Sequence, residues 1–177
     1  MKTSSEKARA MLSTALEMEE KGKSFYRKAH ADCTNALGKE IFKNLTEDED
    51  VHIKRIKVLY ASVSEHRGWS SAWEKAKTTH GDLGLIFRQM AKRYGAGITA
   101  GAGDIEALDM GIDFELRSVE FYGDHLKKAA DAVEKTFLTA MVMEEKNHHA
   151  ILQDMKLYLS DPASWLRERE RGGLDGG

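Results

Sequence analysis

Four stretches of the chain combine an apolar helical stripe with a glutamate at the centre of that stripe. Apolar or small side chains recur there at three- and four-residue intervals, which is the spacing of one face of an α-helix. The glutamates Glu19, Glu49, Glu115 and Glu145 occupy stripe positions at which core residues are expected. Each of the four predicted helices therefore directs a glutamate inward.

These stripes predict four long helices. A helix interior excludes proline, and the single proline of the chain, Pro162, stands near the end, so that nothing before it forces a helix to stop. The apolar periodicity extends from Ser5 to His30, from Phe42 to Tyr60, from Leu108 to Leu126 and from Phe137 to Leu159.

The segments between these helices predict the topology. Turn-forming residues at 31–38 and a break near Ala130 and Asp131 give two short connections, whereas residues 62–103 form a long crossover with two short helices. The glycine run at its end, Gly95 to Gly103, is expected to be a linker. It has neither the preceding strand nor the lysine of a phosphate-binding loop. Asp104 is a suitable N-cap for the next helix.

The expected fold is therefore an all-α four-helix bundle with a long, partly helical crossover between its second and third helices. Residues 1–160 form the bundle domain, including the crossover at 62–103. Residues 161–177 form a C-terminal tail, which we expect to be mobile from Arg167 on.

The composition of the chain excludes several classes of partner and site. The 177 residues carry a formal net charge of −2, so that no basic surplus is available for nucleic acid or for an anionic membrane. A single cysteine, Cys33, excludes an internal disulfide and any metal site built from cysteines alone. The N-terminal residues lack the apolar run of a signal peptide, and no stretch has the length of a membrane span. A cytoplasmic protein is expected.

The stripe glutamates are related by a constant offset. Glu19 and Glu115 are 96 residues apart, as are Glu49 and Glu145, and as are the two histidines His52 and His148. A lone Glu-x-x-His pair on a helix is usually a solvated pair of neighbours. The common offset instead indicates an internal duplication, in which two helical hairpins face each other across an approximate two-fold axis.

Charge then predicts a metal site. Four buried carboxylates without compensation would cost several kcal/mol per ion. No lysine or arginine falls on the inner stripes near the site, whereas two divalent cations would supply the missing positive charge. Mixed oxygen and nitrogen ligands suit iron or manganese, and zinc can also bind them. The expected ligands are Glu19, Glu49, His52, Glu115, Glu145 and His148.

Two tyrosines are candidates for supporting roles. Tyr26 and Tyr122 each follow a stripe glutamate by seven residues, on the same helical face, and their hydroxyls can reach ligand carboxylates. An ordinary core position explains them equally well. We interpret Glu144 and His149 as outer residues, and we exclude as ligands the remaining titratable candidates, namely His30, His66, His80, His125 and Cys33.

The segments ALEMEEKGKSFY, LTEDEDVHIKRI, GIDFELRSVEFY and MVMEEKNHHAIL resemble the rubrerythrins, which belong to the ferritin-like superfamily. The resemblance covers roughly residues 8–160. It implies that Glu19 and Glu115 are terminal ligands of two irons, that Glu49 and Glu145 bridge them, and that one histidine binds each iron.

Two departures from the family pattern matter. Full-length rubrerythrins carry a rubredoxin-like domain with paired Cys-x-x-Cys motifs, which this chain cannot build with Cys33 alone. The electron donor would then be another protein, such as a rubredoxin. Typical members also have a further glutamate three residues after the third-helix ligand, where this chain has Ser118.

The resemblance implies reduction of hydrogen peroxide or dioxygen at a di-iron site. The alternative is a ferritin-like ferroxidase that stores or transfers iron, and a third interpretation is a static structural metal centre or an interaction module. A homodimer is also expected, because the crossover has more apolar side chains than one side of a bundle needs to cover. These are Trp69, Trp73, Leu85, Ile86 and Phe87.

Overall fold

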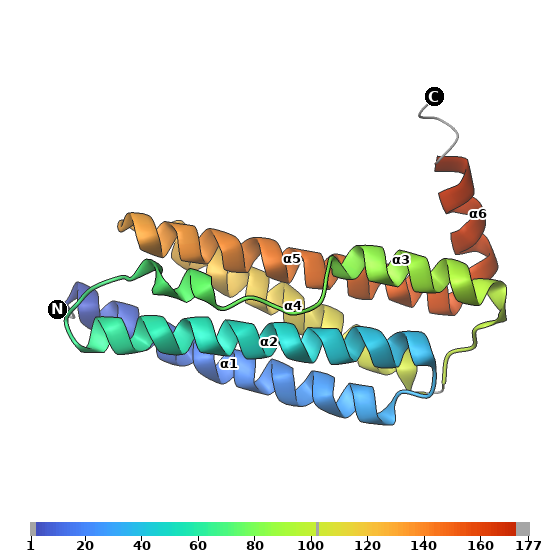
Figure 1. Cartoon of the computed structure of the whole chain (residues 1–177), viewed down its shortest axis with the longest axis horizontal. Coiled ribbons are helices and arrows are strands. Elements are labelled where there is room, and N and C mark those ends of the chain that lie inside the picture. The colour runs from blue at the N-terminus through green and yellow to red at the C-terminus, as the bar shows by residue number, and fades with distance from the viewer. Residues whose placement is uncertain (1–2, 102, 173–177) are drawn as a thin grey trace.

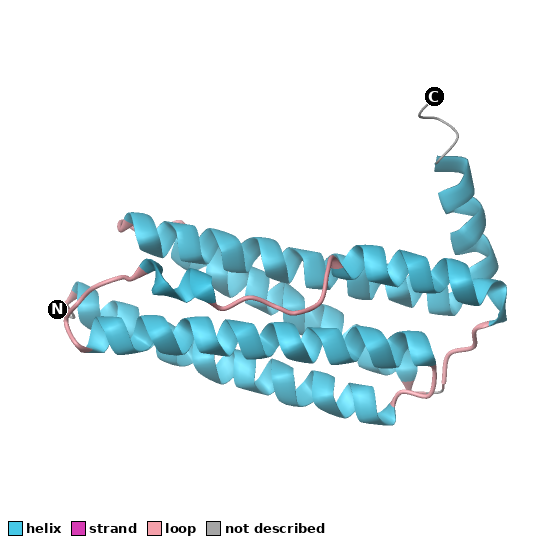
Figure 2. Cartoon of the chain, in the orientation of Figure 1, coloured by secondary structure: helices cyan, strands magenta, loops and turns pink. Residues whose placement is uncertain are grey.

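The computed structural model describes residues 3–101 and 103–172, and within those residues the regular structure is helical, without strands. Figure 2 shows the helices and the loops that join them. The predicted all-α fold is confirmed. Within the described residues, no helix combines the length and the apolar character that a bilayer crossing requires.

Four long helices lie side by side along the long axis of the molecule (Figure 1). They pack as two hairpins, since the most extensive contacts join the first helix to the second and the third to the fourth. The side chains of Asn35 and Asp131 in the short connections cap the helices that follow them. The four helices are α1 (Ser4–Asp32), α2 (Ala36–Ser64), α4 (Asp104–Leu126) and α5 (Ala132–Ser160).

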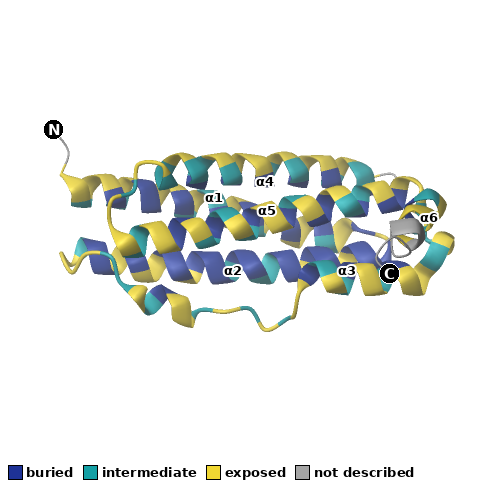
Figure 3. Ribbon diagram, turned by 90° about the horizontal axis from the view of Figure 1, so that it is seen from above, coloured by how far each residue is buried: buried dark blue, intermediate teal, exposed yellow. Residues whose placement is uncertain are grey.

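Buried residues recur along each of these four helices, as Figure 3 shows. Their apolar side chains form two clusters. Along α2, Leu45 belongs to one cluster and Ile56 to the other, and Glu49 and His52 lie between them in sequence. Along α5 the two clusters follow in the opposite order. Met141 belongs to the cluster of Ile56 and Leu152 to the cluster of Leu45, with Glu145 and His148 between them in sequence. The ionisable stripe residues are therefore held in the middle of the bundle, with an apolar core at either end.

The crossover from α2 to α4 packs on the side of α2 and α5, as Figure 1 shows. It contains the 3-10 helix η1 (Ser71–Lys75), α3 (Leu83–Tyr94) and a further 3-10 turn, η2 (Gly95–Gly97). Trp73 and Phe87, which supported the expectation of a homodimer, are buried within the chain itself. Leu85 remains 48% exposed, so the apolar surplus is smaller than the sequence suggested and the dimer stays a prediction.

The start of α4 differs in detail from the expectation. Gly103 is the N-cap, and Asp104 is the first helical residue. The Asp104 carboxylate accepts hydrogen bonds from the backbone N–H of Gly101 at 2.6 Å and from the Asn35 amide at 2.8 Å. Asp104 therefore ties the end of the crossover to the connection between α1 and α2.

The C-terminal region also differs from the expectation. A sixth α-helix, α6 (Pro162–Gly172), follows α5, and it includes residues 167–172 of the expected mobile tail. Its Trp165 is buried against Phe87 and Tyr158, at ring-centroid distances of 5.5 and 5.2 Å. Proline is favoured at the first position of a helix, where its missing N–H has no partner to lose, so Pro162 begins α6 rather than only ending α5. Residues 173–177 lie outside the described part of the chain.

Candidate metal centre

The structure brings the six predicted ligands together at the middle of the bundle. Glu19 comes from α1, Glu115 from α4, and each of α2 and α5 supplies a glutamate and a histidine one turn apart. All six side chains are at most 4% exposed. One turn of helix places residues i and i+3 on the same face, which is why each Glu-x-x-His pair points at the same place.

The six side chains form two overlapping groups. One consists of Glu19, Glu49, His52 and Glu145, and the other of Glu49, Glu115, Glu145 and His148. Within each group, the candidate ligand atoms all lie within 4.8 Å of one another. Glu49 and Glu145 belong to both groups, which is the arrangement of two neighbouring sites that share two carboxylates.

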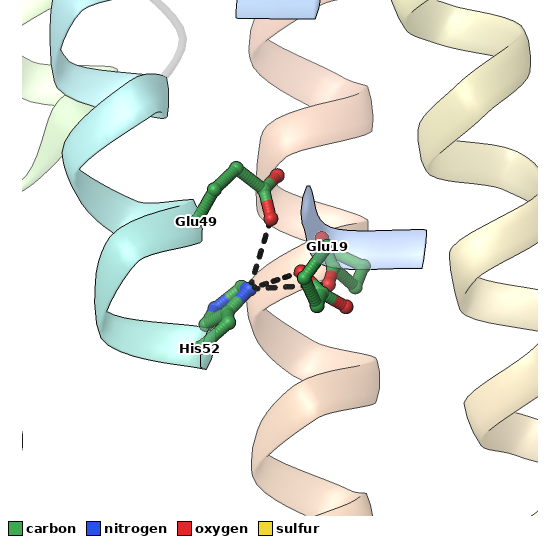
Figure 4. Close-up of side chains that lie close together, drawn as sticks. Glu19, Glu49 and His52 are labelled. Atoms are coloured by element: carbon green, nitrogen blue, oxygen red, sulfur yellow. Dashed lines mark hydrogen bonds and ion pairs between the residues drawn. The ribbon is translucent and has the colours of Figure 1, made fainter. Parts of the chain in front are cut away.

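Both histidines present Nδ1 to the carboxylates. His52 Nδ1 lies 3.1 Å from a Glu19 oxygen and 3.5 Å from a Glu49 oxygen, as Figure 4 shows. His148 Nδ1 lies 3.2 Å from Glu145 and 3.7 Å from Glu115. The two imidazole rings stack at a centroid distance of 5.7 Å. Each group thus contains one imidazole nitrogen directed at its carboxylates.

Without a cation, protons must balance this cluster. Burial and the neighbouring carboxylates raise the pKa of Glu49 and of Glu115 well above the usual range. Burial opposes the charged form of Glu145, but His52 and His148 hold its pKa far below the usual range. Burial likewise opposes protonation of the two histidines, yet the surrounding carboxylates raise both of their pKa values well above 6.5. The site favours positive charge at its centre.

The hydrogen bonding of the cluster is incomplete in a way that fits a metal. Within the part of the chain that the structure describes, several atoms of the cluster are buried without a hydrogen-bond partner. These are both carboxylate oxygens of Glu49 and of Glu145, one oxygen of Glu115, and His148 Nδ1. Leaving such groups unpaired costs free energy, and buried charged groups in proteins are normally paired or bound to metal. Carboxylate oxygens and imidazole nitrogens suit iron and manganese, and they also accept zinc. The residues present therefore fit a two-metal centre.

The two tyrosines contact the cluster crosswise. The Tyr26 hydroxyl on α1 donates a hydrogen bond to Glu115 on α4, and the Tyr122 hydroxyl on α4 donates one to Glu19 on α1. Burial and the nearby carboxylates raise the pKa of both phenols well above 10. Each hydroxyl therefore keeps its proton and holds one oxygen of a cluster glutamate, Glu115 for Tyr26 and Glu19 for Tyr122.

Two further carboxylates, which the sequence did not assign to the site, contact the histidines at Nε2, the ring nitrogen that is not directed at the cluster. Asp48 lies 3.0 Å from His148 Nε2, and Glu144 lies 2.9 Å from His52 Nε2. Such contacts fix the tautomer and the orientation of a ligating imidazole. Asp48 and Glu144 are themselves 96 residues apart, so the constant offset is a sequence signal by which both could have been found.

These outer carboxylates have different partners. Arg55, 8% exposed, contacts both oxygens of Glu144 at 2.8 Å. Burial opposes ionisation of Glu144, but His52 and Arg55 lower its pKa to about 2. His80 of the crossover lies 2.9 Å from Asp48. Arg55 lies beside the inner stripe of α2, not on it, and it pairs with Glu144 rather than with the central carboxylates.

The residues excluded on sequence grounds stay outside both ligand groups. Within the described residues, neither group contains His30, His66, His80, His125, His149 or Cys33. Cys33 is buried, and burial raises the pKa of its thiol. Ser118 is also buried, and its hydroxyl donates to the backbone oxygen of Phe114 at 3.3 Å.

Comparison with known proteins identifies the family. The rubrerythrin family model matches residues 10–156, which span all four bundle helices and the crossover. The chain belongs to the rubrerythrin family. No curated protein and no solved structure matches it. As a rubrerythrin-type, ferritin-like domain, it carries the buried carboxylate and histidine cluster suited to a metal centre.

Proposed function

We propose that this rubrerythrin-family chain is a non-haem di-iron oxidoreductase that reduces hydrogen peroxide or dioxygen. The observation that carries the proposal is the pair of overlapping ligand groups, whose shared carboxylates are buried and have no hydrogen-bond partner in residues 3–101 and 103–172. Metal ions bound by the two groups would supply the positive charge that protons supply in the metal-free cluster.

The assignment of ligands follows the two groups. Glu19 and His52 would hold one ion, Glu115 and His148 would hold the other, and the remaining two glutamates would bridge the ions. When bound, two Fe(II) ions supply one electron each, enough to convert hydrogen peroxide and two protons into two waters. Manganese or zinc would occupy the same ligands without the same readiness to give electrons.

The protein supplies orientation and exclusion of water. The apolar clusters on either side of the site keep solvent from the ligands. Asp48 and Glu144 accept from the Nε2 side of the histidines, which leaves Nδ1 free for coordination. The hydroxyls of Tyr26 and Tyr122 hold the terminal glutamates, and we propose that they support turnover in this way.

The electrons would come from a separate donor protein. A small redox protein such as a rubredoxin is the donor that the family resemblance implies, because one cysteine cannot hold an iron–sulfur centre within this chain. A cytoplasmic homodimer remains part of the proposal.

A second function is favoured by Ser118. Typical rubrerythrins have a glutamate at this position, whereas the hydroxyl of Ser118 bonds to the backbone of its own helix and supplies no further carboxylate. The same six ligands could then serve a ferroxidase, in which Fe(II) is the substrate and Fe(III) is stored or passed on.

Stopped-flow oxidation separates these functions. Anaerobic protein loaded with Fe(II) is mixed with peroxide or with dioxygen, and the absorbance of Fe(III) is followed beside a Glu49→Ala, Glu145→Ala control. Faster oxidation by peroxide, with iron retained and reducible by a donor, supports the oxidoreductase. Faster oxidation by dioxygen, with Fe(III) released to a chelator, supports the ferroxidase. Reaction rates equal to those of the control exclude both.

A further inference from the structure

The seam between α1 and α4 carries an open groove beside the metal centre. The crossover packs on α2 and α5, so its elements cover the other side of the bundle (Figure 1). The contacts between α1 and α4 are far fewer than those within either hairpin. The lining of the groove includes Met18, Lys21 and Phe25 of α1 and Met110, Asp113 and Phe114 of α4.

The lining of this groove suits an uncharged molecule. Its charged side chains are two acids and two bases, Glu17 and Asp113 with Lys21 and Arg117, so that its formal charge is zero. The rest of the lining is largely apolar and comes from methionine and phenylalanine side chains. A cation such as Fe(II) finds no net attraction there, whereas a small neutral molecule avoids the much larger desolvation cost that an ion would have.

One aromatic ring separates the groove from the cluster. Phe114 lines the groove, is only partly buried, and directly precedes the fully buried ligand Glu115. Its ring lies over Gly22, where an added Cβ would stand 2.6 and 2.7 Å from two ring carbons. The same Cβ would be 3.4 Å from the carboxyl carbon of Glu49. One added methyl group would thus contact both the ring and a shared carboxylate.

The absence of a side chain at Gly22 therefore affects how a small molecule could pass from the groove to the cluster. It leaves the Phe114 ring as the barrier between the groove and Glu49, both of whose carboxylate oxygens are buried without a hydrogen-bond partner among the described residues. An aromatic side chain can change rotamer without unfolding its helix, so the ring can act as a gate.

We propose that a small uncharged oxidant reaches the cluster through the α1/α4 groove and that Phe114 is the gate that sets its rate of entry. The inference rests on the proposed reduction of peroxide or dioxygen, both of which are uncharged. Phe114 thereby determines which molecules reach the site, by size and charge, without binding metal itself.

Rates of oxidation in gate variants test this route. In anaerobically Fe(II)-loaded protein, Phe114→Ala should raise the second-order rate constant for peroxide or dioxygen by roughly threefold or more, and Phe114→Trp should lower it by about tenfold. Phe121→Ala is the matched control, because Phe121 lies two turns further along α4 and packs on Tyr122 and His125 instead. Its rate should stay within about twofold of the wild type.

A metal-free measurement tests the groove independently. Dissolved dioxygen is paramagnetic and relaxes the nuclei that it approaches, so methyl NMR of the apoprotein under oxygen pressure reports where it collects. Met18 lines the groove and is partly buried, whereas Met143 is 61% exposed on α5. The proposal expects stronger relaxation at the Met18 methyl than at the Met143 methyl, despite the greater exposure of Met143.

The two experiments distinguish the possible failures. If wild-type protein is oxidised but both Phe114 variants match Phe121→Ala, the gate is wrong and the proposed function stands. If wild-type protein does not react with either oxidant, the proposed function fails, and the NMR comparison alone decides whether the groove admits dioxygen. Relaxation at Met18 no greater than at Met143 would overturn the route.

Discussion

Removal of the Tyr122 hydroxyl measures how strongly the bundle depends on hydrogen bonds to its buried carboxylates. In Tyr122→Phe, Glu19 loses the hydroxyl that donates to one of its oxygens, at a place where both side chains are at most 1% exposed in the wild type. A hydrogen bond to a charged group contributes about 1.5–3 kcal/mol. For a chain of this size, each kcal/mol shifts Tm by about 2–4 °C, so metal-free Tyr122→Phe should melt roughly 3–12 °C below the wild type.

The approximate two-fold axis supplies an internal repeat of this experiment. Tyr26→Phe removes the equivalent bond to Glu115, whose raised pKa keeps this carboxyl protonated in the metal-free protein. The lost bond is then a neutral one, which contributes about 0.5–1.5 kcal/mol, so Tm should fall by roughly 1–6 °C. Tyr60→Phe is the control, because Tyr60 is 40% exposed on the surface of α2, and its Tm should change by less than about 1 °C. Thermal unfolding followed by circular dichroism, with chelator present, is the assay. A fall of less than about 1 °C in both buried variants would refute the reasoning.

Three further predictions concern the protons, the outer carboxylates and α6. The folded apoprotein binds protons at Glu49 and Glu115 more tightly than the unfolded chain does. Its Tm should therefore fall as pH rises from about 4.5 through neutrality, and added Fe(II) should reverse the fall. An apoprotein Tm that rises over this range would contradict the prediction. Glu144→Gln should weaken Fe(II) affinity about 10- to 100-fold, measured by competition with a chelator, since it alters the carboxylate behind His52; unchanged affinity would exclude this role. Trp165→Ala should cost about 3–5 kcal/mol in urea unfolding, whereas a cost below about 1 kcal/mol would mean that α6 does not pack as described.

The periodicity of the sequence predicted the long helices and the residues that lie on their inner faces. The helical stripes and the 96-residue offset predicted four helices and the six side chains that meet between them. The same offset also relates Asp48 to Glu144, but neither lies on an apolar stripe, so the stripe criterion excluded them. Side chains beside a stripe can still reach across to a neighbouring helix, as Glu144 does toward His52.

Other features depended on tertiary contacts that no local pattern encodes. His80 reaches Asp48 only because the crossover lies along α2 and α5, and the path of a long connection is not set by helical spacing. The helix α6 was missed because Pro162 was interpreted only as a stop. The Asp161 carboxylate accepts from the Ser164 backbone N–H at 3.0 Å, so Asp161 both ends α5 and caps α6.

Metal content tests the central claim most directly. Protein purified without chelator, or reconstituted with Fe(II) under anaerobic conditions, should contain about two irons per chain by elemental analysis. The Glu49→Ala, Glu145→Ala variant removes both shared carboxylates and should lose this iron while its circular dichroism remains helical. Wild-type protein that binds no metal after addition of Fe(II) or Mn(II) would contradict the metal centre and leave only the bundle fold.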